Sequence, residues 1–359
     1  MTVELPTGLR PRRPLSRPRT LRGPGGLSLR VEPRALAVGL LLASAAALLS
    51  VVLIGTGDFE IAPADVVRTL LGNGTPAHDF IVNDLRLPRV LVALLVGAAL
   101  GMSGAVFQSL SRNPLGSPDL LGFGYGSVVG ALVVIVFLKG DANAVAGGAL
   151  AGGLLTGVLI YLLSYKRGIH GYRLVLVGIG TSAMLVAAIN YLLTKARFVE
   201  AARATVWLTG SLAGRDWSQV WPLLATCAVL FPLVLVQGRA LRLTEMGDDA
   251  AYALGVRVER MRMLLMLAAV LLTTAAAAAA GPISFVALAA PQLARRLTRS
   301  PGSNLLTGAL MGSVLLLLSD WASQRAFGAD QLPVGVLTGM VGGVYLLWLL
   351  VTERRSGRI

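Results

Sequence analysis

The feature that most constrains the fold of this chain is a series of apolar runs, each close to 20 residues long, between residues 35 and 351. An α-helix of about 20 apolar residues spans the hydrocarbon core of a bilayer. Only 14% of the 359 residues are charged, whereas an average soluble domain has about a quarter. The sequence therefore predicts an all-α fold, a polytopic helical bundle in a membrane.

We expect ten transmembrane helices, of which the eighth is short. They lie near residues 35–54, 87–108, 119–138, 144–164, 173–194, 218–236, 263–281, 283–297, 305–322 and 332–351. The split between the seventh and the eighth rests on Gly281 and Pro282, and one kinked helix is the alternative. Small residues four apart, Gly148/Gly152 and Gly153/Gly157, predict close packing of the fourth helix.

Charge fixes the expected orientation. Ten spans place both termini on one side of the membrane. If that side is the cytoplasm, the inner segments hold 23 of the 32 Lys and Arg residues. Because cytoplasmic loops carry an excess of these residues, the sequence predicts that both termini and residues 237–262 are cytoplasmic.

The first 34 residues form a basic tail with eight arginines and six prolines, a composition typical of disorder. We expect this tail, residues 1–34, in the cytoplasm, in solvent or against anionic headgroups. A cleaved signal peptide ending near "LLASAAALLS" is the alternative, although the 34 residues before its apolar region would be unusually long for a signal peptide. The transmembrane domain is expected over residues 35–352, with a short cytoplasmic tail at 353–359.

Composition argues against several kinds of site. A single cysteine, Cys227, rules out an internal disulfide, and with only two histidines we expect no metal site. The net charge of +14 is spread over tails and loops, so nucleic acid is not an expected partner. The chain contains no G-x-x-x-x-G-K-[ST] phosphate loop. We identify no carboxylate or lysine well inside a span, which disfavours a gradient-driven secondary transporter.

Polar groups inside the apolar runs have a simpler interpretation. Gln108 and Asn190 are the main examples, and Met184 is an adaptable apolar neighbour. A polar side chain within a span more often makes an interhelical hydrogen bond than a contact with a transported ligand. We therefore predict a structural role for these residues.

A charged stretch, "EMGDDAAYALGVRVERMR" (245–262), separates two apolar runs on the predicted cytoplasmic side. Met246, Ala250 and Leu254 recur every four residues and predict a short helix with one apolar face. Gly255 suits the left-handed residue that closes such a helix. A helix this short is unstable alone in water. It must therefore pack on the bundle, on the membrane surface or on another protein.

This stretch resembles the coupling-helix segment of the iron-siderophore and cobalamin importer permeases, the FecCD-like type II ABC importers. "RLPRVLVALLVGAALGMSGAVFQSLSRNPLGSPDLLGF" (86–123), "AGPISFVALAAPQLARR" (280–296) and "QLPVGVLTGMVGGVYLLWLL" (331–350) resemble further family signatures, in family order. The resemblance covers residues 50 to 352. It implies a non-enzymatic permease subunit that moves a ferric siderophore across the cytoplasmic membrane. An enterobactin-like catecholate is favoured, and cobalamin or heme is the alternative.

The resemblance also implies partners and site residues. The partners are a cytoplasmic ATPase dimer that uses Mg and ATP, a siderophore-binding protein outside the membrane, and a second permease subunit. A heterodimer is favoured over a homodimer, and this chain itself would hold no cofactor. The positions that match the ATPase-coupling segment are Glu245, Met246, Gly247, Ala250, Leu254, Gly255 and Val256.

Three arginines on the predicted outer side match positions that dock the binding protein in the family: Arg86, Arg89 and Arg325. Anchoring at a helix end or pairing with nearby acidic residues is the competing explanation for Arg86 and Arg89. One position departs from the family pattern. Gln292 follows Pro291 where related permeases commonly have histidine, so no histidine role can be carried over.

Overall fold

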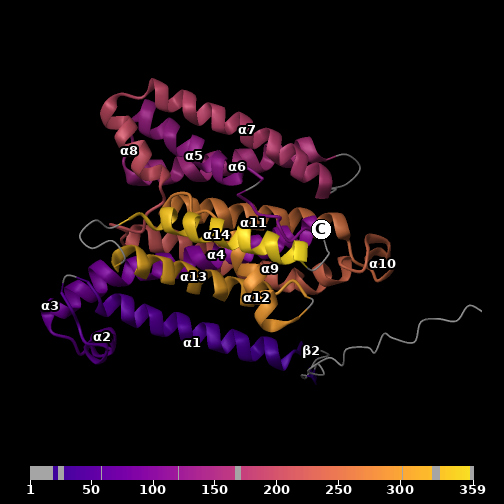
Figure 1. The fold of residues 1–359 in the computed structure, drawn as a ribbon, viewed down its shortest axis with the longest axis horizontal. Helices are drawn as coiled ribbons and strands as arrows, with labels where there is room; N and C mark the ends of the chain where they lie inside the picture. The colour runs from indigo at the N-terminus through magenta and orange to yellow at the C-terminus, as the bar shows by residue number, and fades with distance from the viewer. Residues whose placement is uncertain are drawn as a thin grey trace, which may run out of the picture.

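The computed structural model describes residues 19–22, 28–57, 59–119, 121–165, 171–300, 302–325 and 332–355. Long helices run side by side along one direction and form a membrane-type helical bundle (Figure 1). The elements, apart from an N-terminal hairpin, are α1 (Pro33–Gly55), α2 (Pro63–Leu70), α3 (Pro76–Asp79), the π-helical turn η1 (Phe80–Arg86), α4 (Leu87–Ser111), α5 (Phe123–Val133), η2 (Val134–Leu138), α6 (Ala142–Ser164), α7 (Gly171–Lys195), α8 (Phe198–Leu208), α9 (Trp217–Thr244), α10 (Asp248–Ala253), α11 (Val258–Ala280), α12 (Val286–Thr298), α13 (Leu305–Arg325) and α14 (Val334–Arg355).

All ten expected helices are present, as α1, α4, α5, α6, α7, α9, α11, α12, α13 and α14. Seven of the described helices are long and apolar enough to cross a membrane, and two shorter apolar stretches, Phe123–Leu138 and Val334–Trp348, accompany them. The largest boundary error concerns α9, which continues to Thr244 rather than ending at 236. Hydropathy locates the apolar part of a helix, whereas a helix can continue into water.

The break between α11 and α12 confirms the split into two helices. Gly281 ends α11 with φ 77° and ψ 179°, and Pro282 follows. Phe285 has a left-handed conformation at the start of α12. A residue without Cβ adopts a positive φ at little cost. The 13-residue α12 is too short to span a bilayer alone.

Close backbone approach holds α4 against α13 in the centre of the bundle. Gly97 and Gly101 of α4 face Gly312 and Gly308 of α13, and a Cβ at either α4 glycine would meet the carbonyl group opposite. Lipid tails are as apolar as leucine, so van der Waals contact between backbones is a main source of helix association in a bilayer. Helices α4 and α11 are the most buried of the candidate spans.

A second glycine seam joins α5 to α6. Gly148 and Gly152 of α6 lie against Gly130 of α5, as the small-residue spacing predicted. Helices α5 to α8 form the upper part of the molecule in Figure 1, and α4, α9, α11, α13 and α14 lie below them. Both α6 and α9 pack along α11.

The N-terminal region differs in part from the expected disorder. Strands β1 (Arg19–Arg22) and β2 (Ser28–Val31) pair as an antiparallel two-stranded sheet. Composition predicts the absence of a core, but it does not forbid a local hairpin, which is marginally stable by itself. The remaining residues of the tail before Ser28, and residues 356–359, lie outside the described part of the chain.

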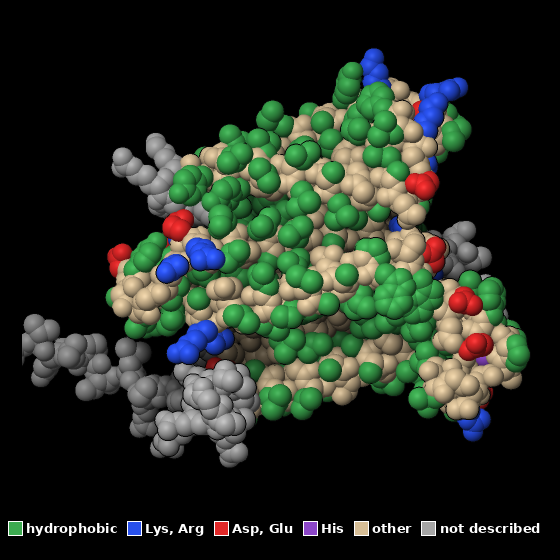
Figure 2. Space-filling model, turned by 180° about the vertical axis from the view of Figure 1, so that it is seen from behind, with side chains coloured by type: hydrophobic (Ala, Val, Ile, Leu, Met, Phe, Trp, Pro, Cys, Tyr) green, Lys and Arg blue, Asp and Glu red, His purple; other side chains and the backbone are tan. Residues whose placement is uncertain are grey.

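Charged side chains collect at the two ends of the bundle, with a mostly hydrophobic surface between them (Figure 2). The beginning of α1 meets the end of α12, where Arg34 Nε donates to the Leu297 carbonyl oxygen at 2.8 Å. Arg112 after α4 reaches the end of α9 at the Thr244 carbonyl oxygen. Helix α10 therefore lies at the same end of the bundle as the start of α1 (Figure 1).

We predict that Gly101→Leu destabilises the protein, because its side chain would occupy the space of the Gly308 carbonyl group. Overpacking of this kind costs about 1–3 kcal/mol or more. The measurement is thermal unfolding of the detergent-solubilised protein. The matched control is Gly339→Leu in α14, where an added Cβ meets nothing within 4 Å. Equal melting temperatures for the two variants would contradict the close packing of α4 against α13 at Gly101.

Candidate functional site

The segment at 245–262 forms a short helix between two tight turns. Gly247 precedes α10 with φ 113°, and Gly255 follows it with φ 82°. The Gly255 amide donates to the Tyr252 carbonyl oxygen at 2.9 Å, and the Val256 amide donates to Ala251 at 3.0 Å. This is the hydrogen-bond pattern of a Schellman cap. The predicted closing role of Gly255 is confirmed.

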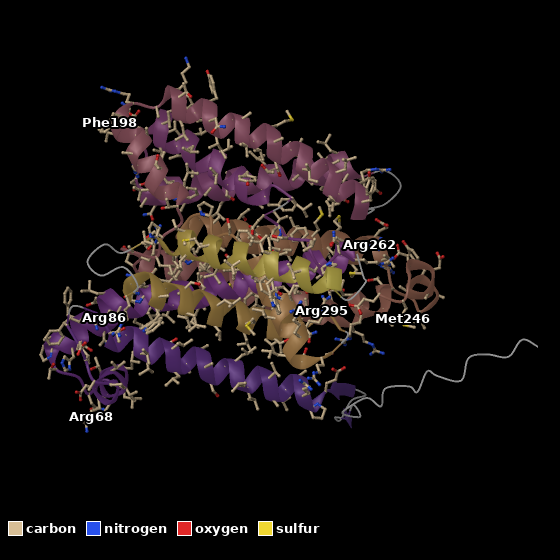
Figure 3. All side chains as sticks on the ribbon, viewed as in Figure 1. Arg68, Arg86, Phe198, Met246, Arg262 and Arg295 are labelled. Atoms are coloured by element: carbon tan, nitrogen blue, oxygen red, sulfur yellow. The ribbon has the colours of Figure 1, made fainter. Side chains whose placement is uncertain are left out.

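Large apolar side chains project from this segment. Met246 is 72% exposed, Leu254 61% and Tyr252 51%, whereas Ala251 is buried against the bundle. Figure 3 shows Met246 at the tip of the α10 end. Exposed apolar groups on a helix that is capped and fixed in place suit contact with another protein better than contact with water. Glu245 lies beside them, and its pKa is raised by partial burial, which the charges of Arg295 and Arg242 oppose.

A two-arginine clamp on Asp248 fixes α10 to the bundle. Arg112, after α4, donates to Asp248 Oδ1 at 2.6 Å, and Arg262 of α11 donates to the same oxygen at 2.8 Å. Asp248 lies in the first turn of α10, where the helix dipole also favours a negative charge. The long-range partner Arg112 was missed because nothing in the sequence links positions 136 residues apart.

The opposite end of the bundle holds Arg86 and Arg89. Arg86 Nη1 donates to the Ile54 carbonyl oxygen and Nη2 to the Phe59 carbonyl oxygen, both at 2.7 Å. Arg86 thus fixes the chain after α1 to the start of α4 (Figure 3). Both guanidinium contacts are within the protein, as the anchoring explanation requires.

Arg89 forms a bidentate ion pair with Asp320 of α13. Nη2 lies 2.7 Å from Oδ1 and Nε lies 3.2 Å from Oδ2, and the Asp320 side chain has no exposed surface. Gln324 Nε2 also donates to Asp320 at 2.9 Å. The sequence predicted no carboxylate well inside a span, and Asp320 lies near the end of α13, where it is buried. Its charge is compensated by Arg89, so it is not a free proton carrier.

Arg325 is the most accessible of the three arginines that the sequence predicts on the outer side. Its guanidinium carbon lies 5.8 Å from the ring centroid of Trp321, a distance at which a cation and an aromatic face attract each other. The side chain is exposed at the end of α13. Of these three arginines, Arg325 is thus the one that the structure leaves most available to a partner.

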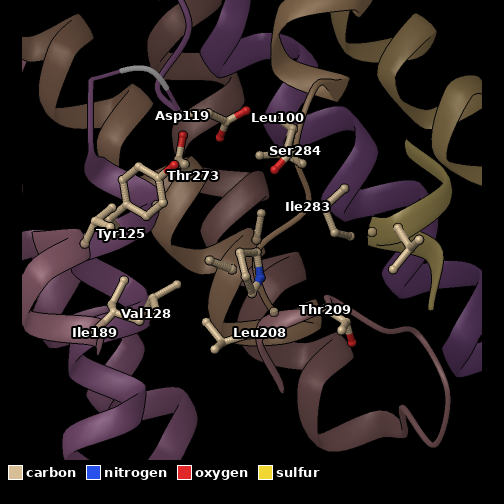
Figure 4. A pocket seen from close by; sticks show the side chains of 18 residues that line it. Leu100, Asp119, Tyr125, Val128, Ile189, Leu208, Thr209, Thr273, Ile283 and Ser284 are labelled. Atoms are coloured by element: carbon tan, nitrogen blue, oxygen red, sulfur yellow. The ribbon is translucent and has the colours of Figure 1, made fainter. Parts of the chain in front are cut away.

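A central cavity of about 490 Å³ lies between the upper and lower helices (Figure 4). Residues from α4, α5, α7, α8, α11 and the break after α11 line it. Its polar groups include Asp119, Tyr125, Thr273 and Ser284, and the rest of the lining is mainly apolar. Sequence reasoning did not find this cavity, since its wall comes from segments that are distant in sequence.

The polar groups at Gln108 and Gln292 are structural. Gln108 Nε2 donates to the Leu288 carbonyl oxygen at 3.0 Å, and Gln292 Nε2 donates to the Pro114 carbonyl oxygen at 2.5 Å. The predicted interhelical role of Gln108 is confirmed. Gln292 thus ties α12 to the turn after α4. Asn190 and Met184 are exposed on α7.

Comparison with known proteins identifies the family. The sequence matches the FecCD transport family over residues 40–352. The chain belongs to this family. The match includes all ten predicted spans except the first residues of the first span, and it includes the α10 segment.

Individual relatives of this FecCD-family chain are permeases. It is 46% identical over 326 residues to the ferric enterobactin transport system permease protein FepG of Escherichia coli, covering 91% of this chain and 99% of that one. It is 37% identical to the Fe(3+)-citrate import system permease protein YfmE of Bacillus subtilis, covering 91% and 98%. A metal-chelate type ABC transporter in an inward-facing conformation has a similar structure, with a TM-score of 0.77 and 26% identity over 89% of this chain and 99% of that one.

We predict that Gly255→Leu uncouples transport from ATP hydrolysis while the protein still folds. An added Cβ at Gly255 meets nothing within 4 Å, so the effect comes from the backbone at φ 82° rather than from a clash. A positive φ costs a bulky residue about 1 kcal/mol or more. Uptake and substrate-stimulated ATPase activity of the assembled transporter are the measurements. Gly255→Asn is the matched control, since Asn tolerates this conformation, and equal loss in both variants would contradict the explanation.

We predict that Arg89→Met lowers the stability by about 3 kcal/mol, because it leaves the buried Asp320 carboxylate without its ion-pair partner. Exchange of the two charges, Arg89→Asp with Asp320→Arg, should restore part of the loss. Thermal unfolding and the affinity for the binding protein are measured together. If the melting temperature of Arg89→Met is unchanged and only its affinity for the binding protein falls, the role of Arg89 is docking rather than anchoring.

Proposed function

We propose that this chain is the permease subunit of an ABC importer that carries a ferric siderophore across the cytoplasmic membrane. The proposal rests on family membership over residues 40–352 together with the α10 segment, an exposed and rigidly held element at one end of the bundle. On this proposal the α10 end and both termini face the cytoplasm. The chain acts as a non-catalytic transport subunit.

A catecholate siderophore similar to enterobactin is the proposed substrate. Support comes from the 46% identity to the ferric enterobactin permease, which extends over 91% of this chain. Cobalamin and heme remain the alternatives within the same family. Direct comparison of ferric tris-catecholate, heme and cobalamin uptake by the assembled transporter distinguishes them.

Coupling to ATP hydrolysis would occur at the residues of the 245–262 segment. Met246 and Leu254 present apolar groups to a cleft on the ATPase, and the caps at Gly247 and Gly255 set the direction of α10. A dimer of cytoplasmic ATPase subunits would bind Mg and ATP, and this chain would need no cofactor. A second permease subunit, in a heterodimer rather than a homodimer, would complete the membrane part.

Docking of an extracytoplasmic siderophore-binding protein would occur at the opposite end. Arg325 is the most accessible of the proposed docking residues, and Arg86 lies on the same face with its guanidinium group held by backbone carbonyls. Arg89 stabilises that face through its ion pair with Asp320, which joins α4 to α13. A few exposed charges speed and orient an encounter more than they tighten it.

We propose that the central cavity forms part of a transport pathway that opens alternately to the two sides of the membrane. It is bounded by the break at 281–285 and by the start of α14, where short and irregular segments meet. Binding of ATP by the partner would favour one of two arrangements of the helices. A ligand shifts such an equilibrium only by its difference in affinity for the two states.

We predict that uptake requires ATP hydrolysis by the partner. Proteoliposomes that contain the assembled transporter and the binding protein should import the ferric siderophore when ATP is present on the ATPase side. A matched preparation with an ATPase-inactive partner should not import it. Import driven by a proton or sodium gradient in the absence of ATP would overturn the proposal and favour a secondary transporter.

A further inference from the structure

A groove separates α6 from α9 at the end of the bundle opposite α10. Both helices pack along α11, but they make almost no contact with each other. The space between them is about 620 Å³. The alanines at 275, 278 and 279 of α11 line it, and their small side chains leave the space open.

The walls of this groove are apolar. Val145 and Leu150 of α6 and Leu223 of α9 line them, and Trp207 lies toward the charged end. Pro222 of α9 and Gly147 of α6 line the groove and are exposed, so the groove opens to the surroundings of the bundle. An apolar opening at this level of a membrane protein faces lipid rather than water.

Two arginines line one end of the groove, beside the start of α9. Arg203 of α8 is exposed, and Arg215, just before α9, is half-buried. Arg215 Nε donates to the Ser211 carbonyl oxygen at 3.1 Å. Among the residues that the structure describes, neither arginine forms an ion pair.

The neighbouring carboxylate is engaged elsewhere. Asp216 caps α9 by accepting a hydrogen bond from the Ser218 amide at 2.7 Å. Burial lowers the pKa of Arg215, and the negative charge of Asp216 opposes this shift. A half-buried guanidinium group that is not fully compensated favours an anionic partner. Asn143 and Gln219 add amide groups at the same end.

We propose that this groove binds one anionic phospholipid, with its phosphodiester between Arg203 and Arg215 and one acyl chain along the alanine face of α11. Guanidinium groups form charge-assisted hydrogen bonds with phosphate oxygens. The groove therefore has basic side chains at one end and apolar walls along its length, which match the charged headgroup and the acyl chain of such a lipid.

The lipid would sit between the helix group α5–α8 and the rest of the bundle. Helix α6 belongs to the first group and α9 to the second, and α11 contacts both. This placement distinguishes the groove from the central cavity, which is lined by α5, by another face of α11, and by Leu100 and Asp119. The proposal does not depend on which substrate the protein transports.

The test measures binding of phosphatidylglycerol to the full-length protein by native mass spectrometry from detergent micelles. Arg203→Gln with Arg215→Gln should weaken binding about 30-fold, which corresponds to about 2 kcal/mol, as expected for two basic contacts with a headgroup. Arg197→Gln is the charge control, because Arg197 precedes α8 and does not line the groove. Zwitterionic phosphatidylcholine should bind more weakly than phosphatidylglycerol to the wild type, and inorganic phosphate should not displace the lipid.

A second variant fills the groove without changing charge. Gly147 lines it, and an added Cβ there meets nothing within 4 Å, so Gly147→Leu should fold and exclude the acyl chain. Gly180→Leu in α7, also with open space at Cβ, is the matched control and should bind lipid normally. Unchanged phosphatidylglycerol binding in either groove variant overturns the proposal. Binding of a ferric tris-catecholate, but not of phosphatidylglycerol, at the two arginines would also overturn it and assign the groove to the substrate.

Discussion

The close approach of α4 to α13 is the contact on which the rest of the bundle depends. A bilayer provides little hydrophobic force between helices, so association requires backbone contact over a large area. Gly97 and Gly101 allow that contact with Gly308 and Gly312. With α4 held in the centre, α9, α11 and α12 can pack around it. The ion pair of Arg89 with Asp320 secures the same two helices near the end of the bundle opposite α10.

Much of the fold follows from local sequence. Ten apolar runs predicted ten helices because a helix in lipid must satisfy its backbone within its own length. Gly281 and Pro282 gave the break before α12, and Gly255 gave the end of α10, since both positions need backbone geometry that few residues adopt. The additional helices α2, α3 and α8 were missed because they are short and outside the apolar runs.

Side-chain partners were much less predictable than helices. Nothing in the sequence marks Asp320 as a partner of Arg89, and only the fold shows that Arg89, 231 positions away, reaches it. The central cavity could not be predicted from the sequence either, because its polar groups, such as Asp119 and Ser284, come from separate segments. The family resemblance singled out the 245–262 segment, which the structure shows to be exposed, but it gave no information on what holds that segment to the bundle.

One oxygen atom at the α10 end links three parts of the chain. Asp248 Oδ1 accepts hydrogen bonds from both Arg112, after α4, and Arg262, on α11. An atom that bonds to two guanidinium groups must stay within about 3 Å of each. Helices α4 and α11 therefore cannot move apart at this end without releasing one arginine. The two hydrogen bonds to this oxygen therefore depend on the spacing between α4 and α11. A displacement of α10 along α4 or along α11 would lengthen one of these bonds and leave the other in place.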